Sequence, residues 1–128
     1  MIDTNILLDW LLDRDPKRTA LIDKLFAKTP ELHVPDLAIV ELVFTLEQYY
    51  DLPRAIVCTN ATKVLDEPKL KCNTALFTTA LTTYLDHPSL SFVDCCLLRS
   101  AELQQNLPLW TFDKKLVNQS SGTARLVK

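Results

Sequence analysis

The fold is decided at the start of the chain, which reads MIDTNILLD over residues 1–9. An acidic residue and an amide, Asp3 and Asn5, interrupt an otherwise apolar opening. The apolar run that continues through Leu12 predicts a first helix packed on the core. Met1 and Ile2 resemble the end of a strand, and sites in open α/β sheets form at the carboxyl ends of strands. Asp3 is therefore the first candidate for a functional carboxylate.

Length and composition favour one soluble domain spanning residues 1–128. Apolar residues make up 48% of the chain and charged residues 23%. No stretch approaches the ~20 apolar residues of a membrane helix, and no secretory signal is recognisable, so we expect a cytoplasmic protein without a membrane partner. Because a central strand needs ~5 residues and only two precede Asp3, we also expect the native chain to begin upstream of Met1.

The cysteines and the glycine content exclude several classes of site. No two of the four cysteines form a C-x-x-C pair, and neither histidine stands at zinc-ligand spacing from them, so we expect buried thiols in a reducing compartment. A single glycine, Gly122, rules out the glycine-rich loops that bind nucleotide phosphates and the nucleophile elbow of serine hydrolases.

Short apolar segments alternate with longer helical ones. Asp15-Pro16 predicts the start of a helix with an apolar stripe through Leu21, Ile22, Leu25 and Phe26. The remaining expected elements are a strand at 32–34, a helix at 37–50 capped by Asp36, helices at 54–65, 73–85 and 91–105, a strand at 107–112, and a final edge strand at 126–127. This alternation predicts an α/β fold with a parallel sheet.

Glu41 is the most informative local anomaly. The helix around it is apolar nearly all round and is expected to be buried. On a helical wheel Glu41 shares a face with Leu37, Ala38 and Phe44, so we expect the carboxylate to point away from solvent. A buried unpaired carboxylate is costly, and a partner is therefore required.

Asp94 and Asp113 each have an ordinary explanation as well as a functional one. Asp94 lies in the first turn of a predicted helix, where the helix dipole favours an acid. Asp113 follows a predicted strand, where a turn residue is common. For either residue alone, capping or turn formation is the better explanation.

Taken together, the four acidic positions change that judgement. Asp3-Thr4-Asn5, Val40-Glu41-Leu42, Ser91-Phe92-Val93-Asp94 and Thr111-Phe112-Asp113-Lys114 stand in the order and spacing of the PIN-domain ribonucleases, which the chain resembles over essentially its whole length. In size and layout it is most similar to the VapC-like toxin branch. The resemblance implies a three-layer α/β/α sandwich with a central, mostly parallel sheet. It also implies that Asp3, Glu41, Asp94 and Asp113 are catalytic and bind Mg²⁺ or Mn²⁺, supported by Asn5 and Thr111.

Elementary electrostatics agrees with a metal ion bound by these four carboxylates. Two carboxylates ~4 Å apart repel by roughly 4 kcal/mol at an effective dielectric of 20, so such a cluster needs a cation. Oxygen ligands select Mg²⁺ or Mn²⁺ over zinc. A metal of this kind supports hydrolysis of a phosphodiester bond. We therefore expect 5′-phosphate and 3′-hydroxyl products.

The charge balance is compatible with an RNA substrate. The formal charge of −2 becomes +2 once the four proposed ligands are set aside. Lys114, Lys115 and Arg99 are candidate phosphate contacts, with Lys69, Lys71 and Arg125 as further ones, although a solvated surface explains any one of them as well. Five aromatic residues can stack bases, but core packing is the more ordinary role. These are Trp10, Phe44, Tyr49, Tyr50 and Trp110.

The sequence thus predicts a metal-dependent endoribonuclease, and the resemblance implies the toxin of a toxin–antitoxin pair with a small antitoxin protein and a homodimer as partners. Two alternatives remain open: a housekeeping PIN nuclease of RNA maturation, and a catalytically silent PIN-fold module that binds RNA or protein. The presence of all four acids counts against the silent module.

Overall fold

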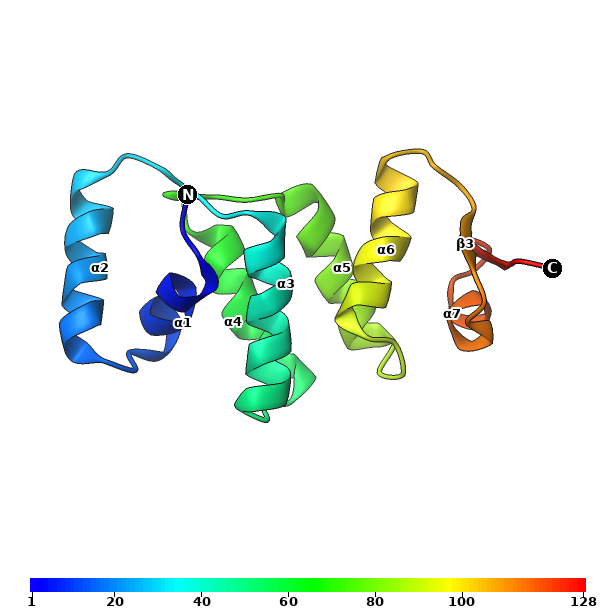
Figure 1. Ribbon diagram of the computed structural model, residues 1–128, viewed down its shortest axis with the longest axis horizontal. Helices are drawn as coiled ribbons and strands as arrows, with labels where there is room; N and C mark the ends of the chain where they lie inside the picture. The colour runs from blue at the N-terminus through cyan, green and yellow to red at the C-terminus, as the bar shows by residue number, and fades with distance from the viewer. The chain divides into compact units, whose positions relative to one another are not determined.

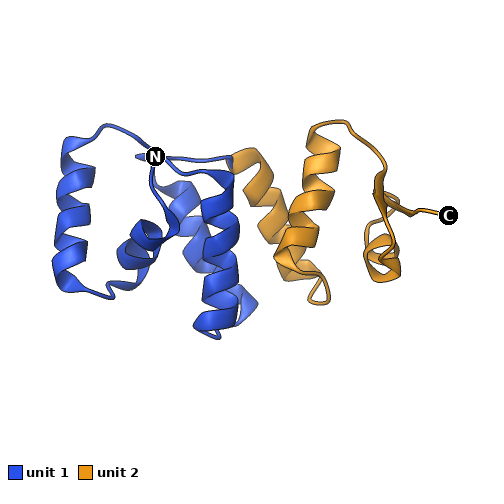
Figure 2. Ribbon diagram, in the orientation of Figure 1, with its two compact units in different colours: residues 1–73 blue, residues 74–128 orange.

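The computed structural model describes all of residues 1–128, which divide into two compact units, Met1–Asn73 and Thr74–Lys128 (Figure 2). Each unit contains helices and one two-stranded parallel sheet. The expected combination of helices with parallel strands is therefore present in both. Because neither sheet exceeds two strands, the three-layer sandwich stays a prediction. Every helix falls short of the length and apolarity that a membrane-spanning segment requires.

Unit 1 is mainly helical. Its elements are α1 (Thr4–Leu12), α2 (Pro16–Lys28), β1 (Leu32–His33), α3 (Asp36–Phe44), the π-helical turn η1 (Thr45–Tyr49), α4 (Arg54–Asp66) and β2 (Leu70–Lys71). Helix α1 packs on α2 and α3, and α3 packs on α4 (Figure 1). The core of the unit lies among these helices, where Leu7, Ile39, Leu42, Val57 and Val64 are fully buried.

Helix α2 begins as predicted but buries a narrower stripe. The Asp15 side chain accepts a hydrogen bond from the Lys17 backbone N at 3.0 Å, and Pro16 occupies the first helical position. Ile22 is 3% exposed, whereas Leu21 is 64% exposed. The predicted four-residue stripe was therefore wrong at Leu21, because one side of this helix faces solvent.

The sheet of unit 1 is built around β1. Leu32 pairs with Leu70 and His33 with Lys71, in parallel. The Ile2 backbone N donates to His33 O at 2.8 Å, so the chain start is extended along the other edge of β1. Strand β2 was not predicted, because two residues carry no recognisable alternation.

Helix α3 differs from the prediction at both ends. Pro35, not Asp36, is the N-cap residue and makes no side-chain cap bond; Asp36 lies in the first turn. The α-helix ends at Phe44 and continues as η1, where Tyr50 N donates to Thr45 O at 3.1 Å across five residues. The predicted helix to Tyr50 is therefore continuous but changes its hydrogen-bond pattern.

Unit 2 begins with a helical pair. Its elements are α5 (Thr74–Asp86), α6 (Phe92–Leu103), β3 (Leu109–Thr111), α7 (Lys114–Gln119) and β4 (Ala124–Leu126). Helices α5 and α6 pack together, as Figure 1 shows. Phe92 stacks on Phe77, with ring centroids 6.2 Å apart, and meets Tyr84 edge-on at 5.5 Å. These aromatic contacts hold the start of α6 against α5.

Strands β3 and β4 run parallel, with Leu109 opposite Ala124, Trp110 opposite Arg125 and Thr111 opposite Leu126. The predicted strands at 107–112 and 126–127 were correct in place and wrong in extent. The short helix α7 connects them and was not predicted, since six residues contain too little periodicity.

Candidate metal site

Asp3 is the N-cap residue of α1. Its Oδ1 accepts a hydrogen bond from Ile6 N at 3.2 Å, and the side chain is exposed. This bond fixes the start of α1 at Thr4, two residues before the predicted apolar run begins. The capping bond engages Oδ1 of the carboxylate and does not engage Oδ2.

Glu41 is exposed, so the prediction that its carboxylate points away from solvent was wrong. Helix α3 buries Ala38, Ile39, Leu42 and Val43. The opposite stripe is exposed, with Leu37 at 81% and Phe44 at 65%. Because the helix is apolar on all sides, its sequence alone does not define the buried face, and Glu41 marks the outer one.

Asp3 and Glu41 line the same pocket of unit 1, which has a volume of 440 Å³. Its other lining residues are Met1, Ile2, Thr4, Pro35, Leu37 and Ala38. The buried Thr4 hydroxyl donates to Ala38 O at 3.4 Å and ties the start of α1 to α3. Two carboxylates 38 positions apart in sequence are thereby held at one hollow.

Asp94 is half-buried and takes part in a capping box of α6. Asp94 N donates to Ser91 Oγ at 3.1 Å, and Ser91 N donates to Asp94 Oδ2 at 3.4 Å. The first-turn role weighed from sequence is therefore present. It leaves Oδ1 of the carboxylate outside the capping box.

Asp113 is the N-cap residue of α7. Its Oδ1 accepts from Lys115 N at 2.9 Å and from Leu116 N at 3.2 Å. Asp113 N in turn donates to Thr111 Oγ1 at 3.0 Å. Thr111 therefore fixes the backbone that presents the carboxylate, and Oδ2 is again not engaged by the cap.

The other predicted site residues are found in varied surroundings. Asn5 is exposed on the first turn of α1, and its carbonyl accepts from Arg14 Nη2 at 3.4 Å. Lys114 and Lys115 are exposed at the start of α7. Arg99 is ion-paired with Glu102 at 2.6 Å, and its Nε is buried without a hydrogen-bond partner. Of Lys114, Lys115 and Arg99, the two lysines are therefore the more accessible.

In neither unit do three or more His, Cys, Asp or Glu side chains gather closely enough to hold a metal ion by themselves. The donor set at the pocket of unit 1 nevertheless fits a hard cation, since Asp3 and Glu41 are exposed carboxylates. Mg²⁺ is commonly held by one or two carboxylates, with water and substrate phosphate completing its shell.

The four cysteines differ in their burial. Burial raises the pKa of the Cys58 thiol, against a weaker opposing effect of Arg54. Burial, assisted by Asp36, also raises the pKa of Cys72. Cys95 and Cys96 are buried, whereas Cys58 and Cys72 are only partly buried, so the expectation of buried cysteines was wrong for those two.

Sequence reasoning missed a buried ionic cluster around Asp9 of α1. Asp9 is 3% exposed; it meets Arg14 at 2.7 Å and Arg18 at 2.9 Å. Burial on its own raises the pKa of Asp9, but the hydrogen bonds and charges of the two arginines outweigh it and hold the pKa below its ordinary range. Tyr50, and then Asp9, raise the pKa of Arg14. The signal available in the sequence was a lone acid inside the apolar segment of α1.

Comparison with known families supplies the class of the protein. The PIN domain matches residues 1–120, so the chain belongs to the PIN domain family. PIN domains have an α/β fold and are generally nucleases, which typically use divalent metals. A nuclease-type function follows for this chain. Comparisons with curated proteins and with solved structures gave no significant match.

Proposed function

We propose that the chain is a Mg²⁺- or Mn²⁺-dependent endoribonuclease whose metal ligands are Asp3, Glu41, Asp94 and Asp113. The observation that carries the proposal is the pocket of unit 1, which Asp3 and Glu41 both line. Membership of a nuclease family over residues 1–120 adds the chemistry. The capping bonds of Asp3, Asp94 and Asp113 also support it, because each bond restricts the position of its carboxylate.

Asp3, Glu41, Asp94 and Asp113 would hold the divalent cation, which when bound would supply an activated water and neutralise charge on the scissile phosphate. The chain's own residues do the rest. Asp3 and Asp113 present oxygen atoms from helix starts, Thr111 fixes the backbone of Asp113, and Lys114 and Lys115 offer positive charge to the phosphates beside the cleaved bond. The products are a 5′-phosphate and a 3′-hydroxyl.

We further propose the three-layer α/β/α sandwich of the family as the complete fold, and a cytoplasmic toxin with a small antitoxin and a second copy of the chain as partners. The resemblance to the VapC-like branch carries this part. A housekeeping nuclease is the alternative. Growth arrest on expression, relieved by a small neighbouring gene product, supports the toxin; normal growth despite active RNA cleavage contradicts it.

The test of the enzyme is cleavage of structured RNA in Mg²⁺, in Mn²⁺ and in EDTA. We expect cleavage only with metal and loss of cleavage in Asp94→Asn. Asp23→Asn is the matched control, because Asp23 is an exposed acid on α2 and is outside the proposed site. A 2′,3′-cyclic phosphate product that persists in EDTA contradicts metal-dependent hydrolysis, and absence of cleavage in every condition supports the silent binding module.

A further inference from the structure

The strands of unit 2 carry an exposed aromatic residue that core packing does not explain. Trp110 on β3 is 59% exposed, although core packing was the more ordinary expectation for it. It lies opposite Arg125 in the register of β3 and β4. Partner residues of parallel strands project from the same face, and neighbouring strands are ~4.8 Å apart. An indole and a guanidinium are therefore neighbours on one surface.

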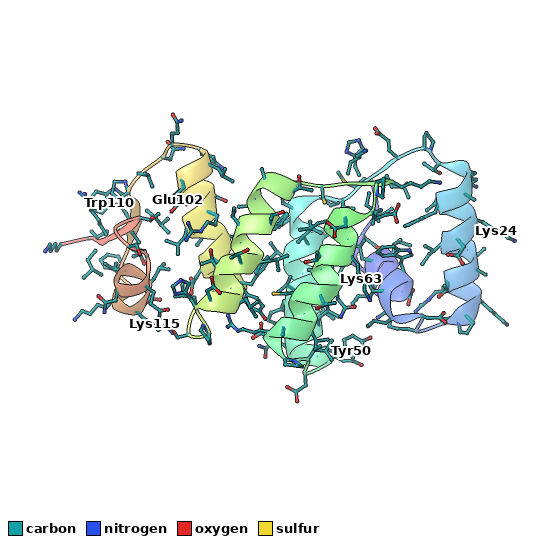
Figure 3. The ribbon with its side chains drawn as sticks, turned by 180° about the vertical axis from the view of Figure 1, so that it is seen from behind. Lys24, Tyr50, Lys63, Glu102, Trp110 and Lys115 are labelled. Carbon is teal, nitrogen blue, oxygen red and sulfur yellow. The ribbon has the colours of Figure 1, made fainter.

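A pocket of 680 Å³ lies at this surface, lined by Trp110, Val117, Arg125, Leu126, Val127 and Lys128. Its side chains are apolar except for two cations, Arg125 and Lys128, and no acidic side chain lines it. Figure 3 shows Trp110 beside the strands, with Lys115 on the nearby helix α7. The pocket thus combines a flat aromatic ring with positive charge.

This combination favours a ligand that carries both flat aromatic rings and negative charge. A nucleobase stacks on an exposed indole whatever its sequence, and the adjoining phosphates meet Arg and Lys. Duplex bases are already stacked on each other and do not offer their faces. An apolar peptide has no anionic groups to pair with Arg125 and Lys128. The chemistry of the pocket is therefore that of a single-stranded polyanion with aromatic bases.

We propose that the Trp110–Arg125 pocket binds single-stranded RNA, with one base stacked on Trp110 and its phosphates on Arg125 and Lys128. This inference deepens the proposed ribonuclease function by naming an unpaired substrate segment and the residues that hold it. Trp110 and Arg125 act in binding, so they govern KM and leave kcat unchanged.

The test measures binding of a short single-stranded oligoribonucleotide in EDTA, where metal-dependent cleavage is prevented. The chain has two tryptophans, so a Trp10→Phe background leaves Trp110 as the only indole. We expect the RNA to quench its fluorescence. Trp110→Ala should weaken binding about 10-fold, within the usual range for stacking of one base. Arg125→Ala should lower the slope of log affinity against log salt by about 1.

Controls separate stacking from charge and from misfolding. Trp110→Leu keeps apolar volume but removes the ring, and it should weaken binding as Trp110→Ala does. Lys24→Ala, on α2 (Figure 3), should bind like the parent. The proposal is overturned if the parent binds an abasic strand of the same length, or duplex RNA, as tightly as the single strand. It is also overturned if Trp110→Ala binds the single strand as tightly as the parent does.

Cleavage in Mg²⁺, measured separately, distinguishes the two proposals. If the parent cleaves RNA but Trp110→Ala binds RNA as well as the parent, the stacking proposal is contradicted and the ribonuclease proposal is supported. If RNA quenches Trp110 and Trp110→Ala weakens RNA binding about 10-fold, but the parent cleaves no RNA, the RNA-binding proposal is supported and the ribonuclease proposal is contradicted.

Discussion

Asp3 caps α1 and, in the proposed site, binds the metal, and one substitution separates the two roles. Asn caps a helix about as well as Asp, so Asp3→Asn should change the free energy of unfolding by less than about 0.5 kcal/mol. It removes the charge that the cation needs, and RNA cleavage should fall more than about 100-fold. Asp3→Ala should lose cleavage equally and about 1 kcal/mol of stability as well.

Urea unfolding and initial cleavage rates measure these two effects. If Asp3→Asn keeps its activity while Asp3→Ala loses stability, Asp3 is a capping residue only. The same comparison applies to Asp113, whose carboxylate caps α7 in the same way.

Asp9 is expected to make unfolding depend on pH. Its folded-state pKa is lowered below the ordinary value of 3.8 by Arg14 and Arg18, despite burial. The stability that it contributes is therefore fully present above about pH 4 and is lost as pH falls through the lower folded-state pKa. Asp9→Asn should cost about 1.5–3 kcal/mol at pH 7, the range for a hydrogen bond to a charged group.

Urea midpoints at pH 7 and below pH 4 give the comparison. The difference in stability between parent and Asp9→Asn should shrink in acid. A difference that stays constant over this range contradicts a charged Asp9 in the folded state.

At the scale of elements, helix α3 offers a matched pair of aliphatic residues. Ile39 is fully buried and Leu37 is 81% exposed. Ile39→Ala should cost about 2–5 kcal/mol through the lost burial and the cavity. Leu37→Ala should remain within about 0.5 kcal/mol of the parent. Thermal or urea unfolding of both variants checks which face of α3 is buried. Equal losses of stability would contradict an exposed Leu37, and with it an exposed Glu41 on the same helix face.

Two helix starts could be predicted from their capping residues, whereas the shortest elements could not, although Asp113 caps α7. Asp15-Pro16 and Ser91 both mark helix starts that the structure contains. Strand β2 and helix α7 are too short to express a period. The orientation of α3 was predicted wrongly because an apolar residue occupies nearly every position, so packing against α1 and α4 chooses the face.

At the scale of the whole molecule, membership of the PIN domain family agrees with the resemblance read from four short acidic motifs. Each motif is short, and the motifs could be recognised because all four stand in the order and spacing of that family. The extent of the sheets could not be predicted, because strands of two or three residues depend on pairing rather than on their own pattern. The single domain, the partners and the metal ligands stay predictions, and the Asp3–Glu41 pocket is the structural ground for the last of these.

Calorimetric titration with Mn²⁺ measures whether Asp3, Glu41, Asp94 and Asp113 bind a catalytic cation. The parent chain should bind Mn²⁺, and each of Asp3→Asn, Glu41→Gln, Asp94→Asn and Asp113→Asn should weaken that binding by at least about 10-fold. Asp23→Asn should bind like the parent. Mn²⁺ binding that survives unchanged in the four variants, or that is absent from the folded parent, would contradict a metal site formed by these four acids.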